Sequence, residues 1–141
     1  MGTGEFAAYA AGAVFLAWSV LLCAFDVRER RLPDALTGPP AVAALVVCLW
    51  QPSLAWGLLW PAWYLLVGRG IGGGDIKLAV PLGVACAAAG GPLGVLAGFG
   101  LSGLFTVGVA VLFRKRSVPH GPSMLCALWM LFPFLCMYSG V

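Results

Sequence analysis

Long apolar runs alternate with short polar breaks along this chain, and each run is long enough to form a helix. The runs cover residues 7–25, 36–50, 54–67, 76–89, 92–113 and 121–138. A helix over residues 7–25 rises about 28 Å, close to the roughly 30 Å hydrocarbon core of a bilayer. Glycine and proline occupy the breaks, as in Gly90-Gly91-Pro92. The pattern predicts an all-α, polytopic membrane protein with about six transmembrane helices.

The composition agrees with a protein that lies in lipid. Hydrophobic residues make up 62% of the chain and charged residues 9%, whereas soluble domains carry about 25% charged residues. The net charge of +3 is too small and too dispersed to indicate a nucleic-acid partner. The five cysteines form no Cys-x-x-Cys pair, so we expect buried small hydrophobes and neither disulfides nor a metal site.

Basic residues fall at three places along the chain, and together they predict its orientation. They lie within residues 28–31, 69–77 and 114–116, which follow the first, third and fifth apolar runs. Loops rich in lysine and arginine stay on the cytoplasmic side of a membrane. All three clusters select the same orientation, with both termini outside.

Two acidic residues at the ends of apolar runs are the candidate chemical groups. Asp26 follows the run 7–25, and Asp75 precedes the run 76–89 on the same predicted side. A carboxylate at the edge of hydrocarbon is costly, so it needs a partner or a function. Two carboxyls held close share a proton, and such a pair hydrolyses peptides by activating water and polarising the scissile carbonyl. Which of the two acts as base stays open, because a coupled pair titrates as a unit.

The residues around these acids suggest supporting roles. Glycine permits unusual backbone angles and close approach, so a substrate strand is expected to lie against Gly72, Gly73 and Gly74. A simpler interpretation makes Asp75 an ordinary N-cap of the following helix. Arg28 and Lys77, each two residues after an aspartate, are candidates to tune the pair or to contact the peptide.

The order of these motifs resembles the type IV prepilin peptidases, which are aspartyl proteases of the Gly-x-Gly-Asp type. The resemblance is carried by Asp26 with basic residues and Leu32-Pro33-Asp34 after it, and by the stretch from Gly72 to Leu78. We expect Asp34 to be a turn and helix-cap residue, with a binding role as the alternative. Longer members carry an amino-terminal region with paired cysteines that methylates the product. Nothing here matches it, so the resemblance implies a single peptidase domain over residues 1–141.

The resemblance implies a membrane aspartyl endopeptidase of the bacterial inner membrane, with its active site facing the cytoplasm. Its substrates would be precursors of type IV pilins, Flp/Tad pilins or pseudopilins, cleaved after a glycine that ends a basic leader. The partners implied are this precursor, the lipid bilayer and a pilus or type II secretion machinery. No metal or organic cofactor is implied, and His120, the only histidine, makes no metal site unaided. We expect His120 to mark a helix boundary, and Gly121 and Pro122 to open the last helix.

Two other functions fit the same acids. A small transporter would use Asp26 and Asp75 to relay protons or bind a cation. A non-catalytic subunit of a pilus assembly machine would need neither carboxyl for precursor processing. Replacing each aspartate by asparagine separates these alternatives from a peptidase.

Overall fold

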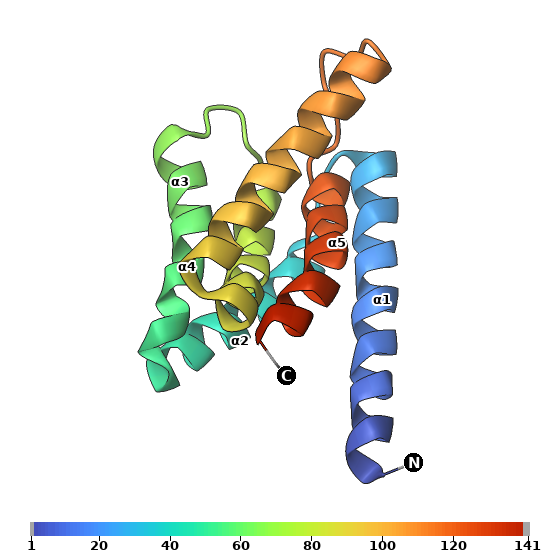
Figure 1. Ribbon diagram of the computed structural model, residues 1–141. Coiled ribbons are helices and arrows are strands. Elements are labelled where there is room, and N and C mark those ends of the chain that lie inside the picture. Colours follow the sequence, from blue (N-terminus) through green and yellow to red (C-terminus); the bar gives the residue numbers. More distant parts are fainter. Residues whose placement is uncertain (1, 140–141) are drawn as a thin grey trace.

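The computed structural model describes residues 2–139, without the side chains at positions 135, 136, 138 and 139. Its described part contains five α-helices and one 3₁₀ helix and has no strand. The elements are α1 Thr3–Glu29, α2 Asp34–Trp50, η1 Pro52–Leu58, α3 Leu59–Val67, α4 Gly73–Leu112 and α5 Gly121–Ser139 (Figure 1). The prediction of an all-α protein is confirmed.

A sharp bend divides α4 into two halves. Gly91 has φ 60° and ψ −150°, a conformation that only glycine adopts readily. The chain reverses there, and Figure 1 shows the second half of α4, in orange, returning alongside the earlier elements. The break predicted between residues 76–89 and 92–113 is therefore present. We call residues 73–90 the first half of α4 and residues 92–112 its second half.

Two other elements differ from the sequence prediction. The run 54–67 does not form one α-helix, because residues 52–58 form η1 and α3 begins only at Leu59. Proline and glycine are the poorest formers of α-helix, and this stretch contains Pro52 and Gly57. Helix α1 continues to Glu29, so Asp26 lies within its last turn.

The helical segments run up and down, with the polar connections at one end. In Figure 1 the connections after α1, α3 and the second half of α4 all lie toward the top, and the two termini lie lower. These connections cover residues 30–33, 68–72 and 113–120 and carry basic residues. The basic segments thus share one end of the bundle. The number of membrane spans and the assignment of this end to the cytoplasm remain predictions.

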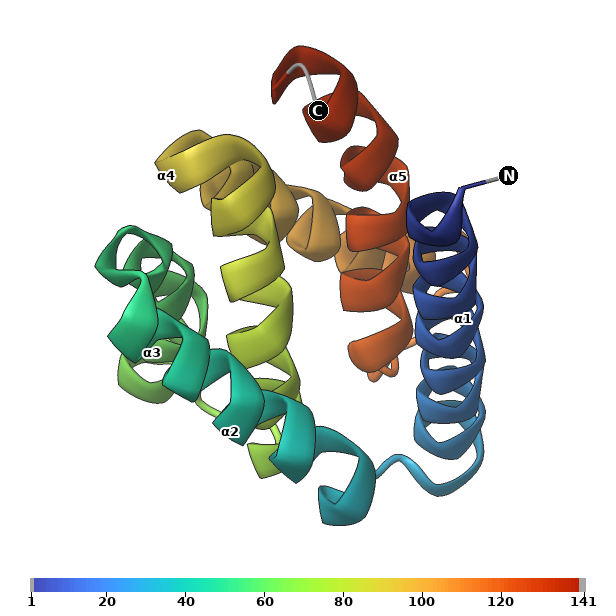
Figure 2. The same ribbon diagram turned by 90° about the horizontal axis from the view of Figure 1, so that it is seen from below.

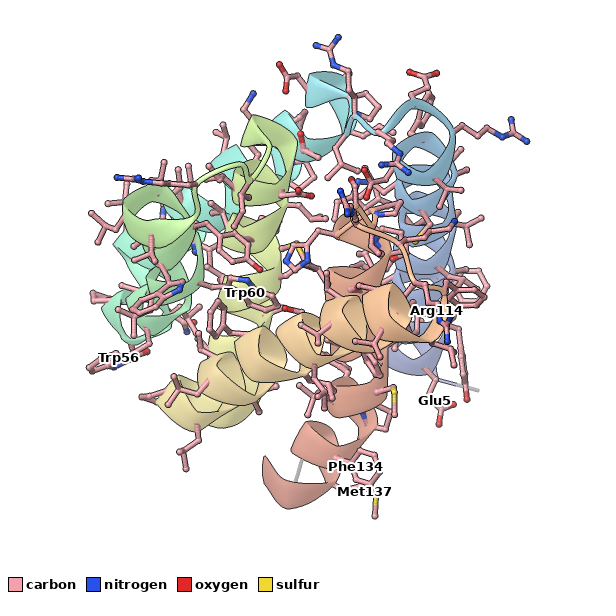
Figure 3. The ribbon with its side chains drawn as sticks, turned by 90° about the horizontal axis from the view of Figure 1, so that it is seen from above. Glu5, Trp56, Trp60, Arg114, Phe134 and Met137 are labelled. Atoms are coloured by element: carbon pink, nitrogen blue, oxygen red, sulfur yellow. The ribbon has the colours of Figure 1, made fainter. Side chains whose placement is uncertain are left out.

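The core lies between α4, α5, α3 and the inner face of α1. Its fully buried large side chains include Leu22, Trp60, Leu78, Leu82 and Met124. Figure 3 shows the contrast between two tryptophans, with Trp60 in the interior and Trp56 at the periphery.

Small residues allow the two halves of α4 to pack closely. A Cβ on Gly98 would lie 2.8 Å from Cys86 Sγ and 3.0 Å from Trp60 Cζ3. Gly94 and Ser102, on the same face of the helix, are also buried. The sequence spacing of these residues therefore marks a packing face, because residues four apart align along one side of a helix.

The outer surface of the bundle is apolar. Helices α1 and α4 are long and apolar enough to cross a membrane, and only 17% of the most apolar window of each is buried. The core helix of a soluble protein would be mostly buried. Large apolar side chains also face outward, as Leu66 and Leu93 do with exposed fractions of 84% and 77%. Exposed apolar surface on this scale suggests a membrane protein.

The closest backbone approach in the core predicts a glycine requirement. A Cβ added to Gly83 would overlap the backbone of Gly57, whereas a Cβ on Gly103 would meet nothing within 4 Å. We expect Gly83→Ala to lower the free energy of unfolding by about 2 kcal/mol or more, because backbone atoms cannot move aside as side chains do. Gly103→Ala is the matched control and should be neutral or stabilising. Thermal unfolding in detergent, followed by circular dichroism, would show the difference, and equal melting temperatures would contradict the assignment.

Candidate active site

A polar cavity of about 320 Å³ lies at the end of the bundle that carries the basic connections. The end of α1, the start of α2 and the start of α4 surround it. Its lining residues are Asp26, Arg30, Arg31, Leu32, Asp34, Gly72, Gly73, Gly74, Asp75 and Lys77. The fold therefore brings both candidate aspartates to one site, and their carboxyls are close enough to interact electrostatically.

Asp26 is fixed from two sides. The residue is buried, with 6% of its surface exposed. Its Oδ2 accepts a hydrogen bond of 2.9 Å from the backbone N–H of Gly121. Gly121 is the first residue of α5, so the carboxyl meets the positive end of that helix. The carbonyl of Asp26 also accepts the N–H of Arg30, which ends α1 in a left-handed conformation with φ 52°.

Asp75 is held differently. It is the third residue of α4, after the N-cap Gly72, and its side chain caps no backbone N–H of the helix. The N-cap interpretation of Asp75 is therefore wrong. Its Oδ1 is buried and has no hydrogen-bond partner within the described residues. A buried polar atom without a partner is rare and calls for an explanation such as a ligand or catalytic role.

The three glycines before Asp75 do not all serve the same purpose. A Cβ on Gly74 would lie 2.7 Å from the Cβ of Leu32, whereas a Cβ on Gly73 would meet nothing within 4 Å. The left-handed glycines in the described part are Gly70 and Gly91, so the expected unusual angles at residues 72–74 are absent. The requirement at Gly74 is one of space, because the start of α4 must pass close to the chain between α1 and α2.

The other motif residues lie around the cavity or just outside it. Lys77 forms an ion pair of 2.7 Å with Asp34, whose side chain is 76% exposed. Such surface pairs contribute about 1 kcal/mol or less, so this one serves to connect α4 to α2. Asp34 is the first residue of α2 after the N-cap Pro33, so the prediction that it caps the helix is wrong. Pro33 and Arg28 are not among the cavity-lining residues.

The sequence interpretation missed Arg30 and Arg31, which it assigned only to topology. Both line the cavity. The guanidinium of Arg30 also donates a hydrogen bond of 2.8 Å to Ser117 Oγ, in the connection before α5. A left-handed residue, Arg30, ends α1 beside the site, and the spacing of charges in the sequence gives no sign of this turn.

His120 lies directly before α5, as expected for a helix boundary, but it also connects three elements. Its Nε2 is 2.6 Å from Tyr64 Oη in α3, and its Nδ1 is 2.6 Å from Thr106 Oγ1 in the second half of α4. The Thr106 hydroxyl donates to the carbonyl of Ser102, so it accepts from Nδ1–H and leaves Nε2 to accept from Tyr64. A neutral imidazole fits this arrangement. Burial lowers the pKa of His120, and the nearby Asp26 carboxylate partly opposes that effect.

No group of three His, Cys, Asp or Glu side chains in the described residues is arranged to hold a metal ion. The cysteines are free where the structure describes them. Cys48 and Cys86 are buried as expected, and Cys23 is half-buried. The expectation of burial is wrong for Cys126, which is exposed. The side chain at position 136 lies outside the described part.

Comparison with known proteins places the chain beside a described family. A sequence model described as the type IV leader peptidase family matches residues 13–108. The matched segment contains both aspartates and every cavity-lining residue. No curated protein sequence and no solved structure matches the chain. The contact of α5 with Asp26 lies partly beyond the matched segment and is seen only in the structure.

The neutral state of His120 predicts its titration. Above pH 6.5 the imidazole is neutral in both the folded and the unfolded chain; below it, the unfolded chain takes up a proton first. Folding stability should therefore fall with pH below 6.5, and less so in His120→Gln. Because the chain has one histidine, nitrogen-15 labelling of histidine gives its titration directly by NMR. We expect a midpoint below 6.5 in the folded protein, and a midpoint at or above that value would contradict the hydrogen-bond assignment.

Proposed function

The chain belongs to the type IV leader peptidase family, and on this premise we propose that it is an aspartyl endopeptidase. We propose that it removes the leader peptide from pilin-like precursors, with Asp26 and Asp75 as the catalytic pair. The observation that carries the proposal is that these two acids, from α1 and α4, line one polar cavity within the matched segment. Two carboxyls at one site are the minimum that this chemistry requires.

The proposed reaction uses the shared proton of the pair. One carboxylate takes a proton from the attacking water while the other carboxyl, protonated, donates a hydrogen bond to the scissile carbonyl. The donor from Gly121 favours keeping the negative charge on Asp26. Asp75 Oδ1, which has no partner in the described residues, is then available to the peptide or to the water.

The position of the cavity suits a substrate at the edge of a membrane. The scissile bond of the proposed precursor follows a glycine and directly precedes a hydrophobic helix, so it reaches the site without crossing the bilayer. We propose that the backbone at Gly72, Gly73 and Gly74 lies along the bound peptide, since these residues line the cavity and two of them are exposed. The side chain of Lys77, which lines the cavity, would contact the leader or orient Asp34. Pro33 and Arg28, which do not line it, would stabilise the conformation of the chain between α1 and α2.

The surroundings of the enzyme complete the proposal. We propose that it is a multi-pass protein of the bacterial inner membrane, with the cavity on the cytoplasmic side. Precursors of type IV pilins, Flp/Tad pilins or pseudopilins are the proposed substrates, and a pilus or type II secretion machinery would use the products. The basic residues at the cavity end of the bundle support this orientation.

Neutralising either acid tests the proposal. We expect Asp26→Asn and Asp75→Asn each to lower the cleavage rate of a pilin-type precursor by about a thousandfold or more, because an amide cannot share the proton. Co-expression with the precursor in membranes, read as a mobility shift on a gel, measures this. Glu29→Gln is the matched control, since Glu29 is an exposed acid on α1 that does not line the cavity. Processing by both asparagine variants at the wild-type rate would favour transport or assembly.

The contact between α5 and Asp26 predicts a second requirement for the same activity. A Cβ on Gly121 would lie 2.8 Å from Asp26 Oδ2, so Gly121→Ala should displace the carboxyl. A displacement near 1 Å costs up to about a hundredfold in rate, and we expect kcat to fall with little change in KM. The control is Gly38→Ala in α2, where a Cβ meets nothing within 4 Å. A kcat within twofold of wild type would show that this contact does not position the acid.

A further inference from the structure

An open apolar groove lies deeper in the bundle than the catalytic cavity. It consists of two adjoining cavities of about 580 and 410 Å³, which share Ala11, Phe15, Ala85 and Leu128. Helix α1 forms one wall, and α2 with the first half of α4 forms the other, while α5 lies behind. Figure 2 shows this separation of α1 and α5 from α2 and the first half of α4. The lining is almost wholly apolar.

Two of the helices that line the groove, α1 and α4, are those that carry the acids. On α1 the groove begins at Trp18, about 12 Å along the helix from Asp26. On α4 it extends from Pro81 to Ala85, about 9 to 15 Å beyond Asp75. Both distances run in the same direction, away from the basic end of the bundle. A chain leaving the catalytic cavity toward the other end would therefore enter the groove after about 3 extended residues.

A hydrogen bond marks the end of the groove nearest the acids. The indole Nε1 of Trp18 donates a bond of 2.9 Å to the carbonyl of Leu36 in α2. This carbonyl has no intrahelical donor, because the residue four positions on is Pro40, which lacks an N–H. Trp18 and Pro40 both line the groove. Because Pro40 cannot donate to it, the Leu36 carbonyl is free to accept from Trp18, and this hydrogen bond joins α1 to α2 at the end of the groove nearest the acids.

We infer that this groove binds the hydrophobic helix of the precursor, immediately after the scissile bond; the inference rests on the proposed function. The groove lies beyond the catalytic cavity along the same two helices, on the side away from the basic end of the bundle. Alanines at positions 10, 11 and 85 line it, and small residues allow the backbone of another helix to approach closely. The groove is the apolar half of a site whose polar half is the catalytic cavity.

A bulky side chain placed in the groove tests this inference, by comparing how fast the variant cleaves two substrates. One is a full precursor with its apolar helix, and the other is a peptide with the same leader and cleavage site that ends before the helix. We expect Ala11→Phe to lower the ratio of kcat/KM for the precursor to kcat/KM for the peptide by about tenfold. Ala13→Phe is the matched control, because Ala13 is exposed on the same helix and lines neither cavity. An unchanged ratio in Ala11→Phe would overturn the inference.

The two substrates also separate this inference from the proposed function. Cleavage of both by the wild type, lost in Asp26→Asn, supports the peptidase whatever the groove does. If the wild type cleaves neither substrate, the proposed function fails and the inference fails with it. If Ala11→Phe slows both substrates equally, the groove contributes to the fold and does not bind the helix.

Photo-crosslinking provides a measurement that does not depend on turnover. A photoreactive residue replaces Val14, which lines the groove, or Val20, which is exposed on α1 outside it. Both are placed in the Asp75→Asn background with the full precursor. We expect an adduct with the precursor from position 14 and little from position 20. Adducts from position 14 only with lipid, or only with a second copy of the chain, would overturn the inference.

Discussion

The structure depends on holding two carboxyls, one buried and one partly buried, at the edge of an apolar bundle. Helix N-termini meet this constraint. Asp26 lies in the last turn of α1 but accepts the first N–H of α5, and Asp75 lies in the first turn of α4. The partial positive charge at a helix N-terminus stabilises a nearby carboxylate. The end of α1 and the starts of α4 and α5, which are far apart in sequence, therefore have to lie side by side. The rest of the fold holds them there.

Close backbone approaches make this arrangement possible. The start of α4 passes against Leu32 at Gly74, and the start of α5 passes against Asp26 at Gly121. A side chain at either position would separate the two acids from each other or from the donor. The His120 hydrogen bonds to Tyr64 and Thr106 then hold the segment before α5 against two other helices. The hydrogen bonds of His120 thus position the start of α5, while Gly74 and Gly121 allow the helices to approach closely enough.

The sequence predicted the parts of this arrangement that are local. Apolar runs gave the helices, glycine and proline gave most of the breaks, and two acids at the ends of runs gave the candidate pair. Contacts between distant segments left no local pattern, so the bond from Gly121 to Asp26 and the turn of Arg30 toward the cavity were not predicted. The 3₁₀ helix at residues 52–58 was also missed. Pro52 and Gly57 disfavour an α-helix there, and the close packing of Gly57 on Gly83 is a contact that a hydrophobicity pattern does not contain.

The two acids are similar in sequence context but differ in their surroundings, and the difference has a consequence for chemistry. Asp26 has a fixed donor, and Asp75 has a buried oxygen that no described residue satisfies. An unsatisfied carboxyl oxygen is costly unless a proton, a water molecule or a ligand meets it. Substrate binding would supply such a partner, so part of the free energy of binding would come from satisfying Asp75. In the proposed mechanism the incomplete acid would then be a feature of the site, since it would direct the peptide to a carboxyl oxygen that no described residue satisfies.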